Sequence, residues 1–286
     1  NIKILEYAEL VDILLSDGEC AGGVVRRTES GELFPVYAAF TLLATGGVGG
    51  LYEHSTNFRH LTGDALAIAG KHNIKLQNPD YVQIHPTTFY TRHPEDRSFL
   101  ISESVRGEGA RLYDKNMNRF VNELLPRDLL SQKIHEQMAK DDTDFVWEDL
   151  RTIPAETLRH HFPNIVEHCR EMGYDVFKEC IPVVPAQHYF MGGVKVDYHS
   201  RSSMENLYVV GEAACNGVHG KNRLASNSLL ESLVFARRAA YDMLFGQAPD
   251  PCQAETDLKR YEDKEALLER YHQIVLEGIG RMRENE

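Results

Sequence analysis

Short runs of alternating apolar and polar residues fill the first part of the chain and predict β-strands. The runs cover residues 2–6, 8–15 and 22–28, and polar turn-forming residues separate them. A continuous apolar run over 39–44 follows and ends in Thr45-Gly46-Gly47. A buried strand that runs into a glycine-rich turn brings backbone amides close to a ligand in α/β proteins. We therefore expect a binding site at the end of this strand.

Helical patterns follow. Thr62-Gly63-Asp64 opens a helix expected over 65–72, with a capping residue and an early carboxylate. The pattern of apolar and polar residues changes from residue 79 to about 185. Apolar residues there recur at helical spacing over 128–139 and over 155–172, and Pro163 interrupts the second run. This stretch is typical of an inserted α+β domain.

A second buried strand is expected over residues 206–212. It leads through a polar loop to Ser226-Asn227-Ser228, a strong helix start. Residues 246–286 are charged and helix-prone. The apolar face of the helix that starts at Ser226 is predicted to consist of Leu229, Leu233, Ala236, Ala240 and Leu244.

Composition narrows the class of protein. The 286 residues are 42% hydrophobic and 26% charged, and the net charge of −12 argues against nucleic acid or an anionic membrane surface as partner. No apolar run approaches the ~20 residues that span a bilayer. Because the first residue is Asn and the sequence opens in mid-pattern, we interpret it as a fragment without a signal peptide.

The cysteines are odd in number and widely spaced, which favours a reduced, cytoplasmic compartment over disulfides or a metal site. They are Cys20, Cys169, Cys180, Cys215 and Cys252.

Polar residues gather in segments 83–87, 102–110 with 126–128, 185–194, and 211–231. Most of these have ordinary explanations. A histidine before proline is usually a capping or core residue, and an Arg beside an Asp is usually an exposed pair worth ~0–1 kcal/mol. Segment 211–231 differs, because it places Asn, Gly, His, Lys and Arg between a strand and a helix, where packing requires none of them. We expect this loop to bind a ligand.

The motifs in these segments resemble the fumarate reductase, succinate dehydrogenase and L-aspartate oxidase flavoprotein family. The resemblance covers roughly residues 40–245 in the family's order. Residues 224–231 and the short stretch between Ala110 and Arg127 look like the L-aspartate oxidase members. The motifs are His85-Pro86-Thr87, Arg106-Gly107-Glu108-Gly109, Pro126-Arg127-Asp128, His188-Tyr189 with Gly192-Gly193, and the whole of 211–231.

The resemblance implies an α/β fold, a partial FAD-binding Rossmann-like domain with an inserted α+β capping domain. The expected boundaries are 1–77 for the middle part of the FAD-binding domain, 78–189 for the capping (substrate) domain, and 190–245 for the last part of the FAD-binding domain. Residues 246–286 would be a linker and the start of a C-terminal helical region. The dinucleotide fingerprint G-x-G-x-x-G lies upstream in the family and is absent here.

A small dicarboxylate substrate, L-aspartate or fumarate, is implied. The family's pattern places His85, His188 and Arg223 around its carboxylates, with Ser102 where the family more often has Thr. Arginine suits this task because its planar fork binds a carboxylate through two hydrogen bonds.

Arg127 matches the family's catalytic arginine, which delivers a proton to fumarate. Because the pKa of arginine exceeds ~12, the role requires a partner that returns the proton. Glu103 and Arg106 match the family's relay carboxylate and second arginine. The alternative for this trio is a purely structural ion network.

Non-covalent FAD is the implied cofactor. Asp64, Glu212, Ser228 and Leu229 match cofactor-contacting positions, and Thr45 with Gly46 ends the buried strand. A helix N-terminus at Ser228 would stabilise negative charge on a reduced flavin, although Ser-Asn-Ser is also an ordinary cap.

The implied reaction is oxidation of L-aspartate to iminoaspartate, with dioxygen or fumarate as acceptor, at the start of NAD biosynthesis through quinolinate. Quinolinate synthase is a candidate partner; a nucleic acid and a membrane are not expected. The alternatives are a fumarate reductase or succinate dehydrogenase flavoprotein subunit with an iron–sulfur partner, and a catalytically silent module. The enzyme hypotheses require that His85, Arg127, His188 and Arg223 converge on one cleft beside Ser228.

Overall fold

The computed structural model describes residues 2–92, 97–248 and 256–283, and Cys252 lies outside them. The chain divides into two compact units. Unit 1 contains residues 1–48, 61–82 and 190–286, and unit 2 contains residues 49–60 and 83–189. Two of the four boundaries between the units lie inside the long strands β6 and β9. The roles predicted for the domains, with boundaries at 77/78 and 189/190, stay a prediction.

Unit 1 combines small sheets with α-helices and short 3-10 helices. The hairpin β1–β2 and strand β3 form one antiparallel sheet, β4 pairs with β11 in parallel, and β10 lies between β5 and β12. Its elements are β1 (Ala8–Ser16), β2 (Glu19–Arg27), β3 (Leu33–Tyr37), β4 (Thr41–Leu43), α1 (Asp64–Lys71), β5 (Leu76–Gln77), β10 (Gly193–Lys195), β11 (Leu207–Val209), the 3-10 helix η2 (Gly211–Ala213), β12 (Ala214–Cys215), α6 (Asn227–Phe245), the 3-10 helix η3 (Leu258–Tyr261) and α7 (Lys264–Arg283).

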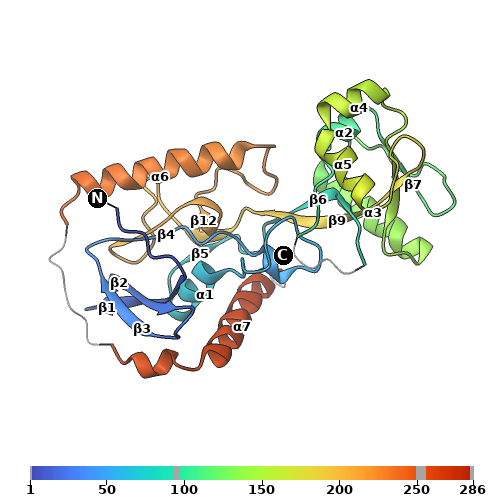
Figure 1. The fold of residues 1–286 in the computed structure, drawn as a ribbon. Coiled ribbons are helices and arrows are strands. Elements are labelled where there is room, and N and C mark those ends of the chain that lie inside the picture. Colours follow the sequence, from blue (N-terminus) through green and yellow to red (C-terminus); the bar gives the residue numbers. More distant parts are fainter. Residues whose placement is uncertain (1, 93–96, 249–255, 284–286) are drawn as a thin grey trace. The chain divides into compact units, whose positions relative to one another are not determined.

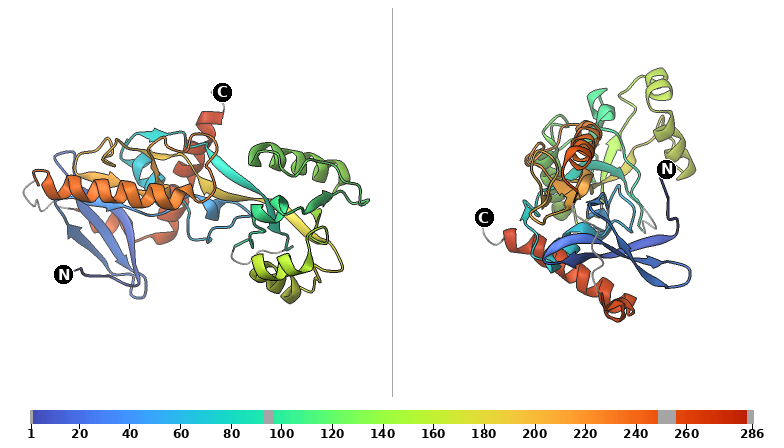
Figure 2. Two further views of the ribbon diagram at one scale, coloured as in Figure 1. Left: turned by 90° about the horizontal axis from the view of Figure 1, so that it is seen from above. Right: turned by 90° about the vertical axis from the view of Figure 1, so that its left-hand side faces the viewer.

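The C-terminal helix α7 lies against α1 and the β1–β3 sheet, as both ribbon figures show (Figures 1 and 2). Gly63, just before α1, has φ 86°, and a Cβ there would lie 3.1 Å from Val275 of α7. The apolar contacts that attach this region to the sheet join Val11, Leu14 and Val24 to Tyr261 and Leu267. Residues far apart in the sequence thus close one core.

Unit 2 is a four-stranded sheet in the order β6-β9-β8-β7, with helices packed on it (Figure 1). Buried side chains from the strands, such as Leu112, Val146 and Val183, meet Leu130 and Ile134 from α3. The elements are the 3-10 helix η1 (Gly49–Leu51), most of β6 (Val82–Phe89), α2 (Glu103–Gly107), β7 (Arg111–Tyr113), α3 (Arg127–Asp141), β8 (Val146–Asp149), α4 (Ala155–His161), α5 (Pro163–Glu171) and most of β9 (Ile181–Phe190).

Several predicted elements are confirmed, and others are wrong. The helical pattern over 155–172 forms two helices that separate at Pro163, as the missing proline N–H requires. Residues 2–5 lie outside any strand, and Ile2 is 94% exposed, because no strand in the described chain pairs with them. Alternation alone, without a partner strand, does not make a sheet.

The apolar face predicted for α6 is wrong except at Ala236, which packs against the core of unit 1. Leu229 and Leu233 are each 72% exposed, whereas Glu231, Phe235 and Ala239 are the buried positions. This second set faces the rest of unit 1, where Ala239 packs with Tyr208 and Val210. Ser226 stands at the N-cap position, but its backbone is left-handed (φ 63°) and its side chain makes no capping hydrogen bond.

Among the described residues, no helix is long and apolar enough to cross a membrane.

Candidate functional site

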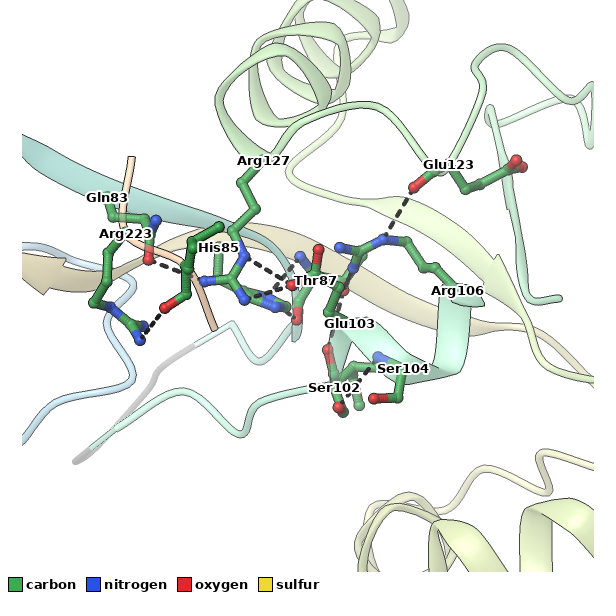
Figure 3. Close-up of polar contacts among 12 residues, drawn as sticks. Gln83, His85, Thr87, Ser102, Glu103, Ser104, Arg106, Glu123, Arg127 and Arg223 are labelled. Carbon is green, nitrogen blue, oxygen red and sulfur yellow. Dashed lines mark hydrogen bonds and ion pairs between the residues drawn. The ribbon is translucent and has the colours of Figure 1, made fainter. Parts of the chain in front are cut away.

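Arg127 of unit 2 is held by two neighbouring side chains. It is the first residue of α3, directly after Pro126, and it is buried. Its Nε donates a 3.0 Å hydrogen bond to Oε2 of Glu103, and a terminal nitrogen pairs with the same oxygen. The other terminal nitrogen donates to Oε1 of Gln83 at 2.9 Å (Figure 3). The guanidinium is therefore fixed in position before any substrate arrives.

Helix α2 carries Glu103 and Arg106 one turn apart, so both side chains lie on one side of it. Arg106 is buried and donates to the hydroxyl of Thr87 and, at 3.3 Å, to the backbone oxygen of Glu123 (Figure 3). Burial lowers the pKa of Arg106, against the opposing effect of nearby carboxylates that include Glu103. An arginine made easier to deprotonate, one turn from a carboxylate that binds Arg127, suits proton transfer.

Ser102 is the N-cap residue of α2. Its hydroxyl accepts a 3.3 Å hydrogen bond from the backbone N–H of Ser104. This contact begins the helix and orients Glu103, the next residue. The structure thus gives Ser102 a structural task, and its predicted contact with substrate stays a prediction.

His85 and His188 face each other across the paired strands β6 and β9. Their ring centroids are 5.3 Å apart in an edge-to-face arrangement. The Nδ1 of His188 lies 2.8 Å from the hydroxyl of Thr56. Burial, together with the positive charges of Arg106, His188 and Arg127, holds the pKa of His85 well below its usual value. His85 is therefore a neutral imidazole at physiological pH.

The structure brings together the predicted residues His85, Glu103, Arg106, Arg127 and His188 within unit 2. Arg223 belongs to unit 1. Its convergence with the others beside Ser228 stays a prediction.

Some residues of unit 2 that contact the predicted site residues were not themselves predicted. Gln83 and Thr87 hold the two arginines, and both lie two positions from His85 on β6, hence on the same face of the strand. Period-two spacing in the 83–87 segment could have identified them. Thr56 could not be found this way, because it is 132 positions away from its partner His188.

Unit 1 presents a second polar arrangement, around Glu212. The Oε1 atom of Glu212 accepts a 2.9 Å hydrogen bond from the backbone N–H of Phe190. Gly47 leaves room for this carboxyl, since a Cβ there would lie 2.5 Å from the same oxygen. Burial raises the pKa of Glu212 to about 7, although Phe190 and Arg223 oppose the shift.

Other residues predicted to contact a cofactor surround this arrangement in unit 1. The Thr45 hydroxyl is buried and has no hydrogen-bond partner in the part of the chain that the structure describes. Gly46 has φ 78°, which favours glycine, and Leu61 closes the space beside it. Asp64 accepts a 3.0 Å hydrogen bond from Thr62.

Arg223 and helix α6 complete the predicted set of unit 1. Arg223 is buried and donates a 3.3 Å hydrogen bond to the backbone oxygen of Leu224. Ser228 and Leu229 lie in the first turn of α6, which holds no acidic side chain, so the positive end of the helix dipole is not neutralised there. An unpaired buried hydroxyl, a glycine cradle and this helix start fit a polar, anionic cofactor such as a flavin.

Comparison with known proteins agrees with this fit. Residues 1–229 match the model of a family described as FAD binding domain. The chain is 48% identical over 285 residues to L-aspartate oxidase of Clostridium perfringens, covering 99% of this chain and 64% of that protein. It is 41% identical over 256 residues to L-aspartate oxidase of Pseudomonas aeruginosa, covering 85% of this chain and 47% of that protein. The chain thus spans about two thirds or less of these relatives.

A solved structure of E. coli quinol fumarate reductase is similar in fold. The TM-score is 0.76 at 31% sequence identity, with 92% of this chain and 48% of that chain covered. The resemblance to flavoproteins that the motifs indicated is confirmed, as is the α/β FAD-binding fold. The chain belongs to the FAD binding domain family, and FAD is its cofactor.

Proposed function

We propose that the protein to which this chain belongs is a flavin-dependent enzyme that oxidises L-aspartate to iminoaspartate. The observation that carries the proposal is the buried cluster of unit 2, where the fixed Arg127 lies among neutral His85, His188 and a second buried arginine. Such a cluster suits an anionic substrate. Relatives named L-aspartate oxidase support the choice of aspartate.

Arg223, His85, His188 and Ser102 are proposed to hold the two carboxylates of the substrate. The neutral imidazole of His85 can donate a hydrogen bond to a carboxylate without adding a charge. The guanidinium of Arg223 would supply the charge-assisted hydrogen bond that fixes one carboxylate. With both ends held, the bond that reacts is oriented by the protein.

Arg127, Glu103 and Arg106 are proposed as the catalytic proton relay. When fumarate is the acceptor, Arg127 gives a proton to the substrate carbon and takes one back from Glu103, to which it is bonded. Glu103 is half exposed, whereas Arg127 is buried, so a proton can pass from the solvent side inward. This order answers the objection that arginine alone is a poor acid.

Bound FAD would accept the hydride from the α-carbon of aspartate, with dioxygen or fumarate as the final acceptor. Thr45, Gly46, Asp64, Glu212, Ser228 and Leu229 are proposed to contact it. The first turn of α6 would stabilise negative charge there, and the Thr45 hydroxyl would gain a hydrogen-bond partner. The imine product is proposed to feed quinolinate and NAD biosynthesis in the cytoplasm, with quinolinate synthase as a partner.

A second candidate is a fumarate reductase or succinate dehydrogenase flavoprotein subunit, favoured by the similarity to quinol fumarate reductase. The discriminating experiment uses the full-length, flavin-loaded protein without oxygen. L-aspartate should bleach the visible flavin absorbance, and succinate should do so far more slowly. Bleaching by succinate alone would support the second candidate, and bleaching by neither would remove both.

A further inference from the structure

Glu148 lies at a position of unit 2 where packing favours an apolar side chain. It is on β8, on the same face as Val146, and it pairs in register with Leu112 of β7 and Ile181 of β9. These three neighbours belong to the apolar core. Glu148 is 0% exposed, and neither carboxyl oxygen has a hydrogen-bond partner among the residues that the structure describes. A buried, unpaired carboxyl is costly, so its presence requires an explanation.

The charged and titratable groups around Glu148 come from separate elements. Arg106 of α2 supplies a positive charge, and Glu123, from the loop before α3, supplies a negative one. Glu123 is held by Arg119 and by the backbone N–H of Leu112, at 2.7 Å and 3.0 Å. The thiol of Cys169 on α5 is the other titratable neighbour, and burial raises its pKa to about 12.

Burial raises the pKa of Glu148 to about 7; Arg106 opposes the shift and Glu123 adds to it. The group therefore changes charge near neutral pH inside an apolar core. The cation that responds to this change is Arg106, whose guanidinium is also buried. In such surroundings a unit charge acts far more strongly than in water.

We propose that Glu148 is a positioning residue for Arg106, and that one proton on its carboxyl sets how firmly Arg106 holds the proton of the relay. This inference rests on the proposed function, since Arg106 is a relay residue only there. When Glu148 releases its proton to solvent, the carboxylate favours the guanidinium form of Arg106. When Glu148 takes the proton up again, Arg106 gives up its own more readily. Only a proton moves in this exchange.

The test uses the full-length, flavin-loaded protein and three variants. Glu148→Gln keeps the shape of the side chain but cannot ionise. Glu148→Leu suits the apolar core, so it remains informative if the amide variant folds poorly. Asp149→Asn is the control, because Asp149 is the next residue on the same strand but its carboxylate binds Arg151 at 2.8 Å.

The measured quantity is the rate of fumarate reduction from about pH 5 to 9. In the wild type and in Asp149→Asn it should fall roughly tenfold as the pH rises through neutrality. In both Glu148 variants this bend should be absent, while the KM for fumarate stays within about twofold, because Glu148 acts on the relay and not on binding. A bend retained in both Glu148 variants would overturn the proposal.

A second readout does not require turnover. The melting temperature of the wild type should fall as the pH rises through about 7, and in the Glu148 variants it should fall by less, because only the contribution of Glu212 remains. Unchanged melting profiles in the variants would show that Glu148 does not titrate and would overturn the proposal. If the wild type melts as expected but turns over neither dicarboxylate, the proposed function fails and the relay role fails with it. An active enzyme with unaltered pH profiles would refute the role of Glu148 alone.

Discussion

Asp12 in the core of unit 1 offers a sharp test of how this fold is held together. Its carboxylate is fully buried on β1 and binds Lys71 and His72 at the end of α1, the latter at 2.7 Å. The hydroxyl of Tyr261, 249 positions away, donates to it at 2.7 Å, and the backbone N–H of Ile13 donates at 2.9 Å. One side chain thus joins the first sheet, the first helix and the C-terminal region.

Replacing Asp12 with Asn preserves the shape and removes the charge. Lys71, whose side chain is 16% exposed, would then lose its counter-ion while staying among the rings of Tyr261 and Tyr271. Breaking a buried ion pair by removing one partner costs about 3–5 kcal/mol. Tyr261→Phe removes one hydrogen bond from the same carboxylate and should cost about 0.5–1.5 kcal/mol.

Urea unfolding followed by circular dichroism gives the free energy of unfolding for each variant. Glu32→Gln is the control, because the Arg27–Glu32 pair is exposed and should contribute only ~0–1 kcal/mol. Burial raises the pKa of Asp12, but His72, Lys71 and Tyr261 together outweigh it and lower the pKa below 3.8. The ionised form therefore stabilises the fold above that value, and this stability is lost as the pH falls through the lower native pKa. An Asn variant as stable as the control at neutral pH would refute the reasoning.

Further predictions concern the two candidate sites. Arg127→Lys should lower fumarate reduction at least ~100-fold with dicarboxylate binding largely kept, measured by rates and by substrate-induced flavin spectra; wild-type rates would remove Arg127 from the mechanism. Gly47→Ala should weaken FAD binding in a flavin titration, because the new Cβ displaces the Glu212 carboxyl, whereas Gly280→Ala has open space and should not. Glu212→Gln should flatten the pH dependence of stability: neutral Glu212 favours the fold, and the wild type loses that contribution as the pH rises through about 7. A pH dependence equal to that of the wild type would contradict this last expectation.

Much of the local structure of this chain follows from its sequence. The helical spacing within α3 and the proline that separates α4 from α5 act over a few residues, so pattern and backbone chemistry suffice to predict both features. Residues 2–5 show the limit of this reasoning. They alternate as a strand does, but a strand forms only where a neighbour supplies hydrogen bonds, and the sequence does not say which neighbour that is.

Helix α6 shows a different limit. Its leucines are spaced as an apolar face, yet the positions that pack are Phe235 and Ala239, together with Glu231, which receives a hydrogen bond from Asn216. Periodicity identifies a stripe but not the surface that the stripe meets. A polar residue can occupy the buried side wherever the loop before the helix supplies its partner.

The candidate site divides in the same way. The motif residues of unit 2 could be identified from the sequence. The structure adds the side chains that hold them in place, above all Gln83 and Thr87. These buried contacts explain how a chain with a net charge of −12 can suit an anionic ligand. Charges on the surface are screened over about 8–10 Å in physiological salt, whereas the buried guanidiniums of Arg106 and Arg127 are screened much less. Local burial, and not the overall charge, therefore sets which ligand this cluster favours.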